Sequence, residues 1–303
     1  MSNLLFFTDC HLASEPPAQR HGDYGRDILT KLEWVVEQAP MFDYVLFGGD
    51  FVHSPAASLR LVHEAVCALS PLDHKLALCW GQHDLGKGHV PAEIGRSSAS
   101  LLYWGLTHHT GTQGFRRLCL GELDLALLSH HPQIEEVLLA KDVGENSAPI
   151  VVAHALIGLQ YPFKACTMGA RLVLSGDWHE GYPPHPVGDT WFANPGALAR
   201  VSIDDYGRVP QVAAIQWGDG QGVVESIEYV PVPCRPAPAV FDLEAHLAAK
   251  EKQGKHSAYV AALAEGGTDP FTPVDDALAG MELETPVRKY VQEKLTTAQE
   301  GAE

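Results

Sequence analysis

Short apolar runs, each followed by a polar loop, recur along the first two thirds of the chain. Three of them, Leu4–His11, Asp43–His53 and Leu76–Asp84, have the length and composition of buried strands that end in polar loops. Apolar residues at helical spacing lie between them and predict one helix around Ile28–Val36 and another from about Ala57 to Leu69. The first part of the chain therefore predicts alternating strands and helices.

Strands dominate the next part of the chain. Phe115–His131 predicts two adjacent strands around a turn at Gly121, and a helix is expected near Pro132 to Ala140. Three more apolar segments with polar ends and a closing hairpin follow: Ala148–Ala155, Arg171–His179, Thr190–Ala197 and Val212–Val232. Alternating elements followed mostly by strands are typical of a layered α/β sandwich with mixed sheets.

The last part of the chain begins with a proline-spaced segment, Val230–Pro238, that has the composition of a linker. Beyond it, apolar periodicity predicts a helix from about Leu243 to Ala264 and a second that opens with Thr285 and Pro286. The second helix is too short to be stable alone, so we expect it to dock on this protein or on another. We predict one domain over residues 1–232 and a helical accessory region over residues 233–303.

The composition, with 46% hydrophobic and 19% charged residues, is that of a globular protein. No apolar run is long enough to cross a membrane and no signal peptide is recognisable, so we expect a cytoplasmic protein without a membrane partner. The six cysteines form no CxxC pair and are expected to be reduced. The formal charge of −17 repels polyanions, so a nucleic-acid substrate would need a basic patch, metal ions or a basic partner.

Imidazole, carboxylate and amide side chains stand directly after the predicted strands. The candidates are Asp9, His11, Asp50, His53, Gln82, His83, Asp84, His154, Asp177 and His179. Taken singly, a polar residue at a strand end is more often a turn or packing residue than a ligand. Together they predict a mixed nitrogen and oxygen metal site, of a kind that suits Mn, Fe or Zn. They outnumber the ligands that one ion takes, which indicates two ions with one shared carboxylate.

The order of these motifs, DxH at Asp9, GDxxH at Asp50, GxHD around His83, AHA at His154 and GDxH at Asp177, resembles the calcineurin-like metallophosphoesterase superfamily. The resemblance extends to about residue 232 and implies a four-layer α/β/β/α sandwich. Further features are similar to the nuclease subunit of SbcCD-type DNA repair complexes. They are the Asp50–His53 spacing, the segment Asn194–Arg200 (NPGALAR) and the segment from Tyr24 to Leu32.

The resemblance also implies roles for individual residues. Asp9, His11, Asp50 and His179 would hold one ion, and Gln82, His154 and Asp177 would join a bridging Asp50 on the second. Water activated by the two ions would then attack the phosphorus in line.

Further roles concern the substrate. His83 would face the scissile phosphate, with Asp84 orienting it, and His53 would position the phosphate. We add Asn194 and Arg200 as candidates for substrate binding, although a plain turn explains Asn194 nearly as well.

Two residues depart from the superfamily pattern, and both belong to the second ion. Gln82 stands where the family has Asn, and Asp177 stands where it has the first His of GHxH. A longer amide opposite a compact carboxylate is interpreted as a pair of adjustments that keeps four ligands and favours Mn or Mg over Zn. The alternative is a weakened second site, which would leave a one-metal enzyme or a binding subunit.

We therefore expect a phosphodiesterase with two divalent ions, most simply Mn, with Mg, Fe or Zn as alternatives. By resemblance it would be a DNA nuclease subunit whose C-terminal helices dock on an SMC-type ATPase, and a homodimer is possible. The alternatives are a phosphodiesterase for small nucleotides, a phosphoprotein phosphatase, or a binding subunit with weakened catalysis. The sequence leaves open whether cleavage is exo- or endonucleolytic.

Overall fold

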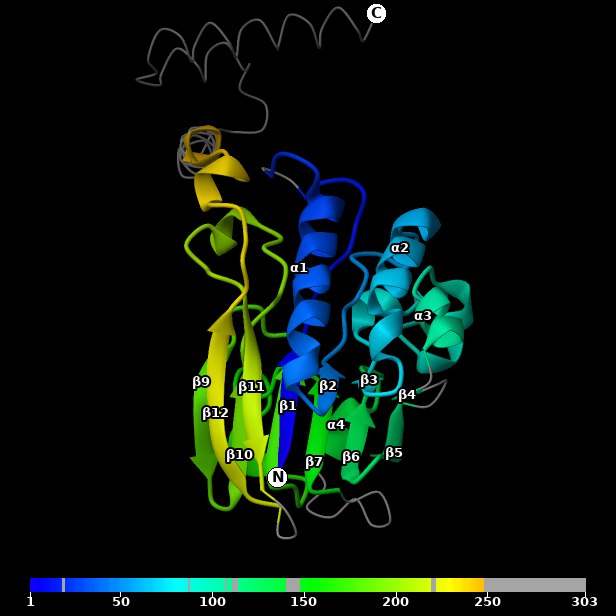
Figure 1. Ribbon diagram of the computed structural model, residues 1–303, viewed down its shortest axis with the longest axis vertical. Helices are drawn as coiled ribbons and strands as arrows, with labels where there is room; N and C mark the ends of the chain where they lie inside the picture. Colours follow the sequence, from blue (N-terminus) through cyan, green and yellow to red (C-terminus); the bar gives the residue numbers. More distant parts are fainter. Residues whose placement is uncertain are drawn as a thin grey trace, which may run out of the picture. The chain divides into compact units, whose positions relative to one another are not determined.

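The computed structural model divides into two compact units, Met1–Leu243 and Glu244–Glu303 (Figure 1). It describes residues 1–17, 20–86, 88–106, 108–110, 114–139, 148–218 and 222–247. Almost all of the second unit lies outside these ranges, including the predicted helix from Thr285 and most of the predicted helix from Leu243. The architecture below is that of the first unit.

The first sheet has six strands in the order β12-β11-β1-β2-β3-β4. Their bounds are β1 Ser2–Phe7, β2 Tyr44–Phe47, β3 Leu76–Leu78, β4 His108–His109, β11 Gln211–Trp217 and β12 Val224–Pro231. Strands β1 to β4 are parallel to one another, with Leu4 beside Tyr44 and Val45 beside Leu76. The hairpin β11-β12 extends the sheet by antiparallel pairing to β1.

The second sheet also has six strands, in the order β5-β6-β7-β8-β10-β9. Their bounds are β5 Phe115–Leu120, β6 Leu123–Leu128, β7 Ile150–His154, β8 Leu172–Gly176, β9 Tyr182–Val187 and β10 Thr190–Asn194. Strands β6, β7, β8 and β10 are parallel, whereas β5 and β9 pair antiparallel at the two edges.

The α-helices are α1 Tyr24–Gln38, α2 Leu59–Leu69, α3 Ser100–Gly105 and α4 Ile134–Leu138. Short 3-10 helices lie at Ala39–Met41, Ser70–Leu72, Gln82–Asp84, Pro91–Arg96, Phe163–Ala165, Ile203–Asp205 and Ala237–Ala239. Helix α1 begins after Asp23, whose carboxylate accepts the Arg26 N–H at 2.9 Å. In the part of the chain that the structure describes, no helix is both long and apolar enough to span a bilayer.

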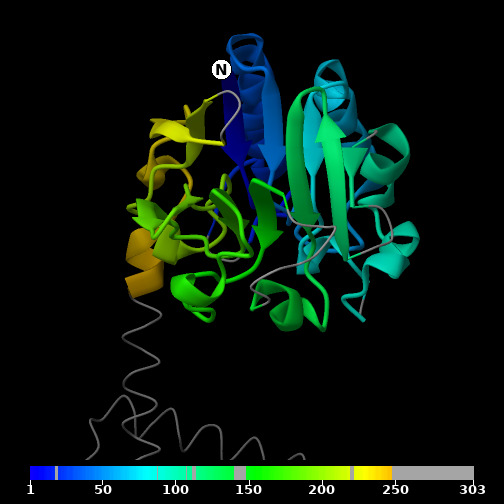
Figure 2. The same cartoon turned by 90° about the horizontal axis from the view of Figure 1, so that it is seen from below.

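Apolar side chains pack between the two sheets and between each sheet and the helices outside it. Leu4, Phe6 and Leu46 of the first sheet pack against Leu125, Ile150 and Leu172 of the second. Helices α1 and α2 cover the outer face of the first sheet with Ile28 and Val62 among their core residues, and α4 covers the second with Ile134 and Leu138. The result is the predicted four-layer α/β/β/α sandwich, which Figure 2 shows from below.

Several elements differ from the sequence prediction. Strand β9 contains three prolines and was not predicted, but it pairs only with β10 at a sheet edge, where missing N–H donors are tolerated. Strand β4 and helix α3 were also not predicted, because two and six residues are too short to show a period. The predicted linker runs into a packed segment, since Val240 and Phe241 are buried against Ile203.

Candidate metal centre

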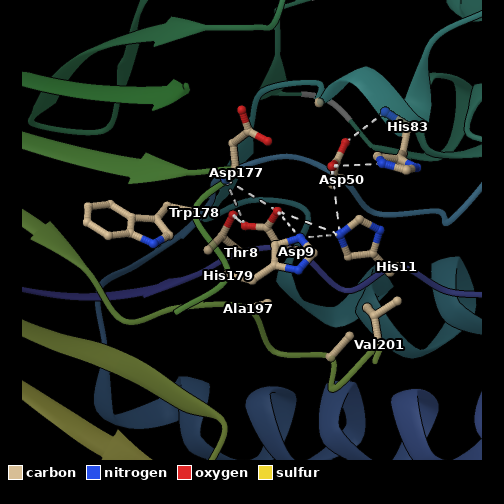
Figure 3. A network of polar contacts seen from close by, with 12 residues as sticks. Thr8, Asp9, His11, Asp50, His83, Asp177, Trp178, His179, Ala197 and Val201 are labelled. Carbon is tan, nitrogen blue, oxygen red and sulfur yellow. Dashed lines mark hydrogen bonds and ion pairs between the residues drawn. The ribbon is translucent and has the colours of Figure 1, made fainter. Parts of the chain in front are cut away.

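The ligand loops meet at one edge of the two sheets. Asp9 and Asp50 follow the parallel strands β1 and β2, and Gln82 follows β3. His154 is the last residue of β7, and Asp177 comes directly after β8. Because the carboxyl ends of parallel strands lie at the same edge, the topology brings these side chains together. Figure 3 shows Asp9, His11, Asp50 and His179 converging, with Trp178 turned away from them.

Four predicted ligand residues have a positive φ angle, in the left-handed region. The φ angles of Asp9, His11, Asp50 and Asp177 are 56°, 44°, 55° and 78°. Such angles cost energy for residues other than glycine and persist where the surrounding structure enforces them. The backbone itself therefore marks these four loop positions as unusual.

Asp9, His11 and His179 form the first ligand group. The Nε2 atoms of His11 and His179 are 2.9 Å apart, and each lies 3.7–3.8 Å from Oδ1 of Asp9. The other carboxylate oxygen of Asp9 accepts the Thr8 hydroxyl at 2.5 Å and the Asp177 N–H at 3.1 Å. Asp9 is thus fixed on one side while its Oδ1 faces the two imidazoles.

Asp50 lies between the two ligand groups. Its Oδ1 accepts the His83 N–H at 2.8 Å, and its Oδ2 is 3.7 Å from His11 Nε2 and 3.3 Å from His154 Nε2. Burial on its own raises the pKa of Asp50, but the facing His154 and His11 lower it, and the net pKa is below the usual range. Asp50 is therefore a carboxylate held in its charged form, placed to bridge.

Gln82, His154 and Asp177 form the second ligand group. His154 Nδ1 is 2.6 Å from the Gly48 carbonyl oxygen, which turns Nε2 toward Asp50 and leaves it 3.8 Å from Asp177 Oδ1. The Gln82 amide nitrogen donates to Asp177 Oδ1 at 2.7 Å. This bond directs the amide oxygen of Gln82 away from Asp177, where it is buried without a hydrogen-bond partner.

Unpaired buried atoms test whether metal ions fit this site. Oε1 of Gln82 is buried without a hydrogen bond, and Oδ2 of Asp50 and Nε2 of His154 are buried 3.3 Å apart without hydrogen-bond geometry. Such atoms are rare in folded proteins, and a carboxylate oxygen, an imidazole nitrogen and an amide oxygen are each atoms that can bind a divalent cation. Within the described residues, Asp9, His11 and His179 have ligand atoms within 4.8 Å of one another, as do Asp9, Asp50 and His154. The residues fit divalent metal.

His83 and His53 form a third feature of the site. His83 Nδ1 is 2.8 Å from the His53 carbonyl oxygen, and its Nε2 lies 4.0 Å from Asp50 Oδ2. The His83 side chain is 38% exposed, so it reaches both the ligands and solvent. The His53 ring stacks on His83 with centroids 5.5 Å apart. Both predicted phosphate-facing imidazoles therefore stand at the rim of the ligand cluster.

The predicted role of Asp84 as the residue that orients His83 is wrong. Asp84 is fully buried, and its two oxygens accept the N–H groups of Val52 and Gly81, both at 2.9 Å. The 3-10 turn Gln82–Asp84 points it inward, and the His53 carbonyl orients the His83 ring instead. Burial and the charge of Asp50 raise the pKa of Asp84 to about 7.

Asn194 holds a ligand loop. Its side chain is buried, donates to the Trp178 carbonyl at 3.2 Å and accepts the Gly196 N–H at 2.8 Å. Gly196 has φ of 81°, and a Cβ there would lie 2.6 Å from the His179 carbonyl oxygen. Asn194 thus shapes the turn that supports His179, and its predicted contact with substrate gains no support.

Arg200 is also placed apart from the ligands. It is 3% exposed, its guanidinium donates to the Arg235 carbonyl at 2.5 Å, and it lies over the Phe241 ring. A phosphate contact by Arg200 therefore gains no support from its position either.

A buried lysine supports the first ligand group and was given no role from the sequence. Lys31 of α1 is 2% exposed and donates from Nζ to the Leu198 carbonyl at 2.6 Å. The N–H groups of Leu198 and Ala199 donate in turn to the carbonyls of Thr8 and Asp9, at 2.9 and 3.1 Å. The signal in the sequence was a lysine inside the apolar face of the helix, next to Leu32.

Two arginines complete this support. Arg208 donates to the carbonyls of Ala197 and Ala199, and Arg20 donates to the Arg200 carbonyl. Four consecutive carbonyls, those of residues 197–200, thus accept hydrogen bonds from lysine and arginine side chains. We call residues 197–200 the brace, because N–H groups of this segment donate to carbonyls in the loops of Asp9 and His179.

Residues 2–181 match the model of a protein family described as calcineurin-like phosphoesterase. The chain belongs to this family. Membership implies hydrolysis of phosphoric esters with divalent metal ions, in agreement with the ligand cluster. The resemblance that the motifs carried is confirmed at the level of the family.

Solved structures with a similar fold include three bacterial proteins. One is a predicted phosphoesterase from Streptococcus pneumoniae TIGR4, at 13% identity and TM-score 0.38, covering 78% of this chain and 93% of that one. The other two come from Thermus thermophilus. The sulfate thiohydrolase SoxB is 15% identical, with TM-score 0.44, and covers 84% of this chain. A 5′-nucleotidase precursor is 14% identical, with TM-score 0.45, and covers 87% of this chain. The chain spans 61% and 59% of those two proteins. No curated protein matches it in sequence.

Proposed function

We propose that the protein is a metal-dependent phosphodiesterase that acts on DNA, as the nuclease subunit of an SbcCD-type complex. The observation that carries the hydrolytic part is the buried, unpaired set of Asp50 Oδ2, His154 Nε2 and Gln82 Oε1 beside the first ligand group. One shared carboxylate between two groups of ligands supports two ions. When bound, the ions would neutralise phosphoryl charge and make water a better nucleophile at neutral pH.

Residues of this chain hold the metal ligands in place and supply a proton for the leaving oxygen. The ligands of the first group are fixed by the Thr8 hydroxyl and the brace, so they need little reorganisation when phosphate arrives. His83 donates its Nδ1 proton to the His53 carbonyl, which leaves Nε2 to carry the proton for the leaving oxygen. This atom lies 4.0 Å from the Asp50 carboxylate, so the imidazole of His83 is adjacent to the ligand that faces both groups.

Manganese is proposed as the native ion. The second ligand group offers the Gln82 amide oxygen and the Asp177 carboxylate where the superfamily pattern has an amide and an imidazole. A more oxygen-rich set favours Mn or Mg over Zn.

Two features support DNA as the substrate. The Asp50–His53 spacing places the His53 ring against His83, and the NPG turn at Gly196 supports His179, so two of the three features that resemble the nuclease subunit adjoin the site. The formal charge of −17 favours a second candidate, a phosphodiesterase for small nucleotides, because a strongly acidic protein repels a polyanion.

Metal content and cleavage measured on one sample test this proposal. Protein loaded with Mn is analysed for ions per chain and assayed on linear double-stranded DNA and on bis-p-nitrophenyl phosphate. His83→Ala is compared with His74→Ala, an exposed histidine at the opposite end of β3. We expect two ions and cleavage of both substrates, which only His83→Ala impairs. Hydrolysis of the small ester alone would favour the second candidate, and hydrolysis of neither by the loaded protein would overturn the enzymatic role.

The proposed partner is an SMC-type ATPase, bound through helices in residues 243–303. Most of this region lies outside the described residues, so the proposal rests on the sequence pattern of a short helix that begins at Thr285. Deleting residues 285–303 should abolish co-purification with the ATPase and leave ester hydrolysis intact. Unchanged binding would remove this role from the helix.

A further inference from the structure

A pocket of about 500 Å³ opens beside the ligand cluster. Six of the residues that the structure describes line it: Pro55, Gln82, His83, Leu85, Gly86 and His89. The volume lies within the range of pockets that hold small organic ligands. Two of the six, Gln82 and His83, also belong to the candidate metal centre, so the pocket and the site share a wall.

The chemistry of the walls is unlike that of the site next to it. None of these six described residues is Asp, Glu, Lys or Arg. Pro55, the partly exposed imidazole of His83 and the exposed imidazole of His89 supply ring surface instead, because the Leu85 side chain is fully buried. A second phosphate would find no cationic partner among these residues, whereas a flat, uncharged ring would find surfaces to stack on.

His89 is held in the wall of this pocket. Its φ of 50° is left-handed, its Nδ1 lies 3.2 Å from the Gln82 carbonyl oxygen, and its ring meets His130 edge to face at 5.9 Å. An exposed histidine kept in a costly backbone conformation by two neighbours indicates a defined position for this ring.

We propose that the pocket binds a flat aromatic ring, such as a nucleobase, on the ester group that faces His83. This inference rests on the proposed phosphodiesterase function, because it places the phosphorus at the ligand cluster. His83 then lies between the phosphorus and the pocket, so the group whose oxygen it protonates would carry the ring that enters the pocket. The ring could come from a free nucleotide or from an unpaired base of a nucleic acid.

Competition between two phosphate esters tests the pocket. AMP and ribose 5-phosphate carry the same charged group, but only AMP has the ring. With bis-p-nitrophenyl phosphate as substrate, we expect AMP to inhibit at roughly tenfold lower concentration, because ring burial adds apolar area. His89→Ala should reduce this ratio toward one, His89→Phe should preserve it, and His74→Ala should leave it unchanged. Inorganic phosphate should inhibit all four proteins equally.

Equal inhibition by AMP and ribose 5-phosphate in the native protein would overturn the pocket while leaving the phosphodiesterase function intact. A protein that hydrolyses no ester would fail the proposed function instead, and calorimetric binding of AMP and ribose 5-phosphate to the Mn-loaded protein then decides the pocket by the same ratio.

If the ratio holds, a further competition experiment identifies the source of the ring. A single-stranded oligonucleotide that competes with AMP more strongly than duplex DNA would identify the unpaired base as the source, and AMP alone competing would identify free nucleotides.

Discussion

In the first ligand group two imidazoles meet with their Nε2 atoms 2.9 Å apart, whereas in the second group an amide and a carboxylate are joined by a 2.7 Å hydrogen bond. The first group, Asp9, His11 and His179, keeps the superfamily residues and is held from behind by the brace. The second contains both residues that depart from the superfamily pattern. Asp50 faces both groups.

The two residues that depart from the superfamily pattern contact each other. The Gln82 amide nitrogen uses Asp177 as its acceptor, and this contact turns the amide oxygen into a buried atom without a partner. A histidine at position 177 would offer no carboxylate to fix the longer amide. This contact between Gln82 and Asp177 is the one that the interpretation of paired adjustments requires.

Removing the charge of Asp50, the carboxylate that faces both ligand groups, should weaken metal binding by both groups at once. Asp50→Asn keeps the shape of the side chain but loses the charge that faces His11 and His154. We expect a loss of at least roughly 10³-fold in kcat for bis-p-nitrophenyl phosphate and loss of both ions. Elemental analysis and steady-state kinetics measure this, with Asp189→Asn, an exposed carboxylate paired with Arg171, as the control. Two retained ions would contradict the bridging role.

Exchanging Gln82 and Asp177 should change the affinity for the second ion without changing the affinity for the first. Gln82→Asn or Asp177→His alone breaks the amide contact and should weaken binding of the second ion by about ten- to a hundredfold, with the first ion unaffected. The double variant restores the superfamily pair and should recover most of this affinity. Manganese titration by calorimetry reports both ions, and losses that simply add in the double variant would show that the two positions are independent.

Weakening the brace should affect only the first group. Lys31→Met removes the donor to the Leu198 carbonyl, behind the Thr8 and Asp9 loop. We expect about tenfold weaker binding of the first ion, with the second unchanged. Lys75→Met is the matched control, since Lys75 also donates to backbone carbonyls, those of Ala39 and Phe42, at a site without ligands. Equal effects of the two variants on manganese affinity would reduce the brace to a general stabilising contact.

The same lysine gives a smaller effect that depends on pH. Burial, together with the charges of Arg20 and Arg200, lowers the pKa of Lys31 from 10.5 to about 7. Between these values the unfolded chain binds more protons than the folded one, so this residue makes the free energy of unfolding rise with pH. From pH 7 to pH 8 the native protein should gain about 1 kcal/mol relative to Lys31→Met in urea unfolding. A constant difference would mean that Lys31 stays charged in the folded protein.

Much of the fold followed from local patterns. The parallel strands β1 to β3, the helices α1 and α2, and the pair β5 and β6 lie where apolar periodicity placed them, since a buried strand or helix face needs an apolar period. The edge strand β9 did not, because its three prolines break that period, and only pairing with β10 makes it a strand.

Candidate site residues followed from the sequence for a similar reason. Parallel strands must end at one edge, so polar residues directly after them, such as Asp9, Asp50 and Asp177, are brought together by topology alone. The orientation of each side chain was beyond the sequence. Asp84 stands next to His83 in the chain, yet its oxygens are taken by the N–H groups of Val52 and Gly81, because a 3-10 turn directs it inward.

By itself, the amino-acid sequence determined the layered fold, the edge where chemistry is placed and the types of ligand available there, since these depend on periodicity and on the order of motifs along one chain. Only the tertiary structure decided which atoms are left without partners, that Gln82 and Asp177 act as a pair, and that Lys31 supports the Asp9 loop from another element. These facts depend on contacts between residues far apart in the chain, whose distances and directions no local pattern encodes.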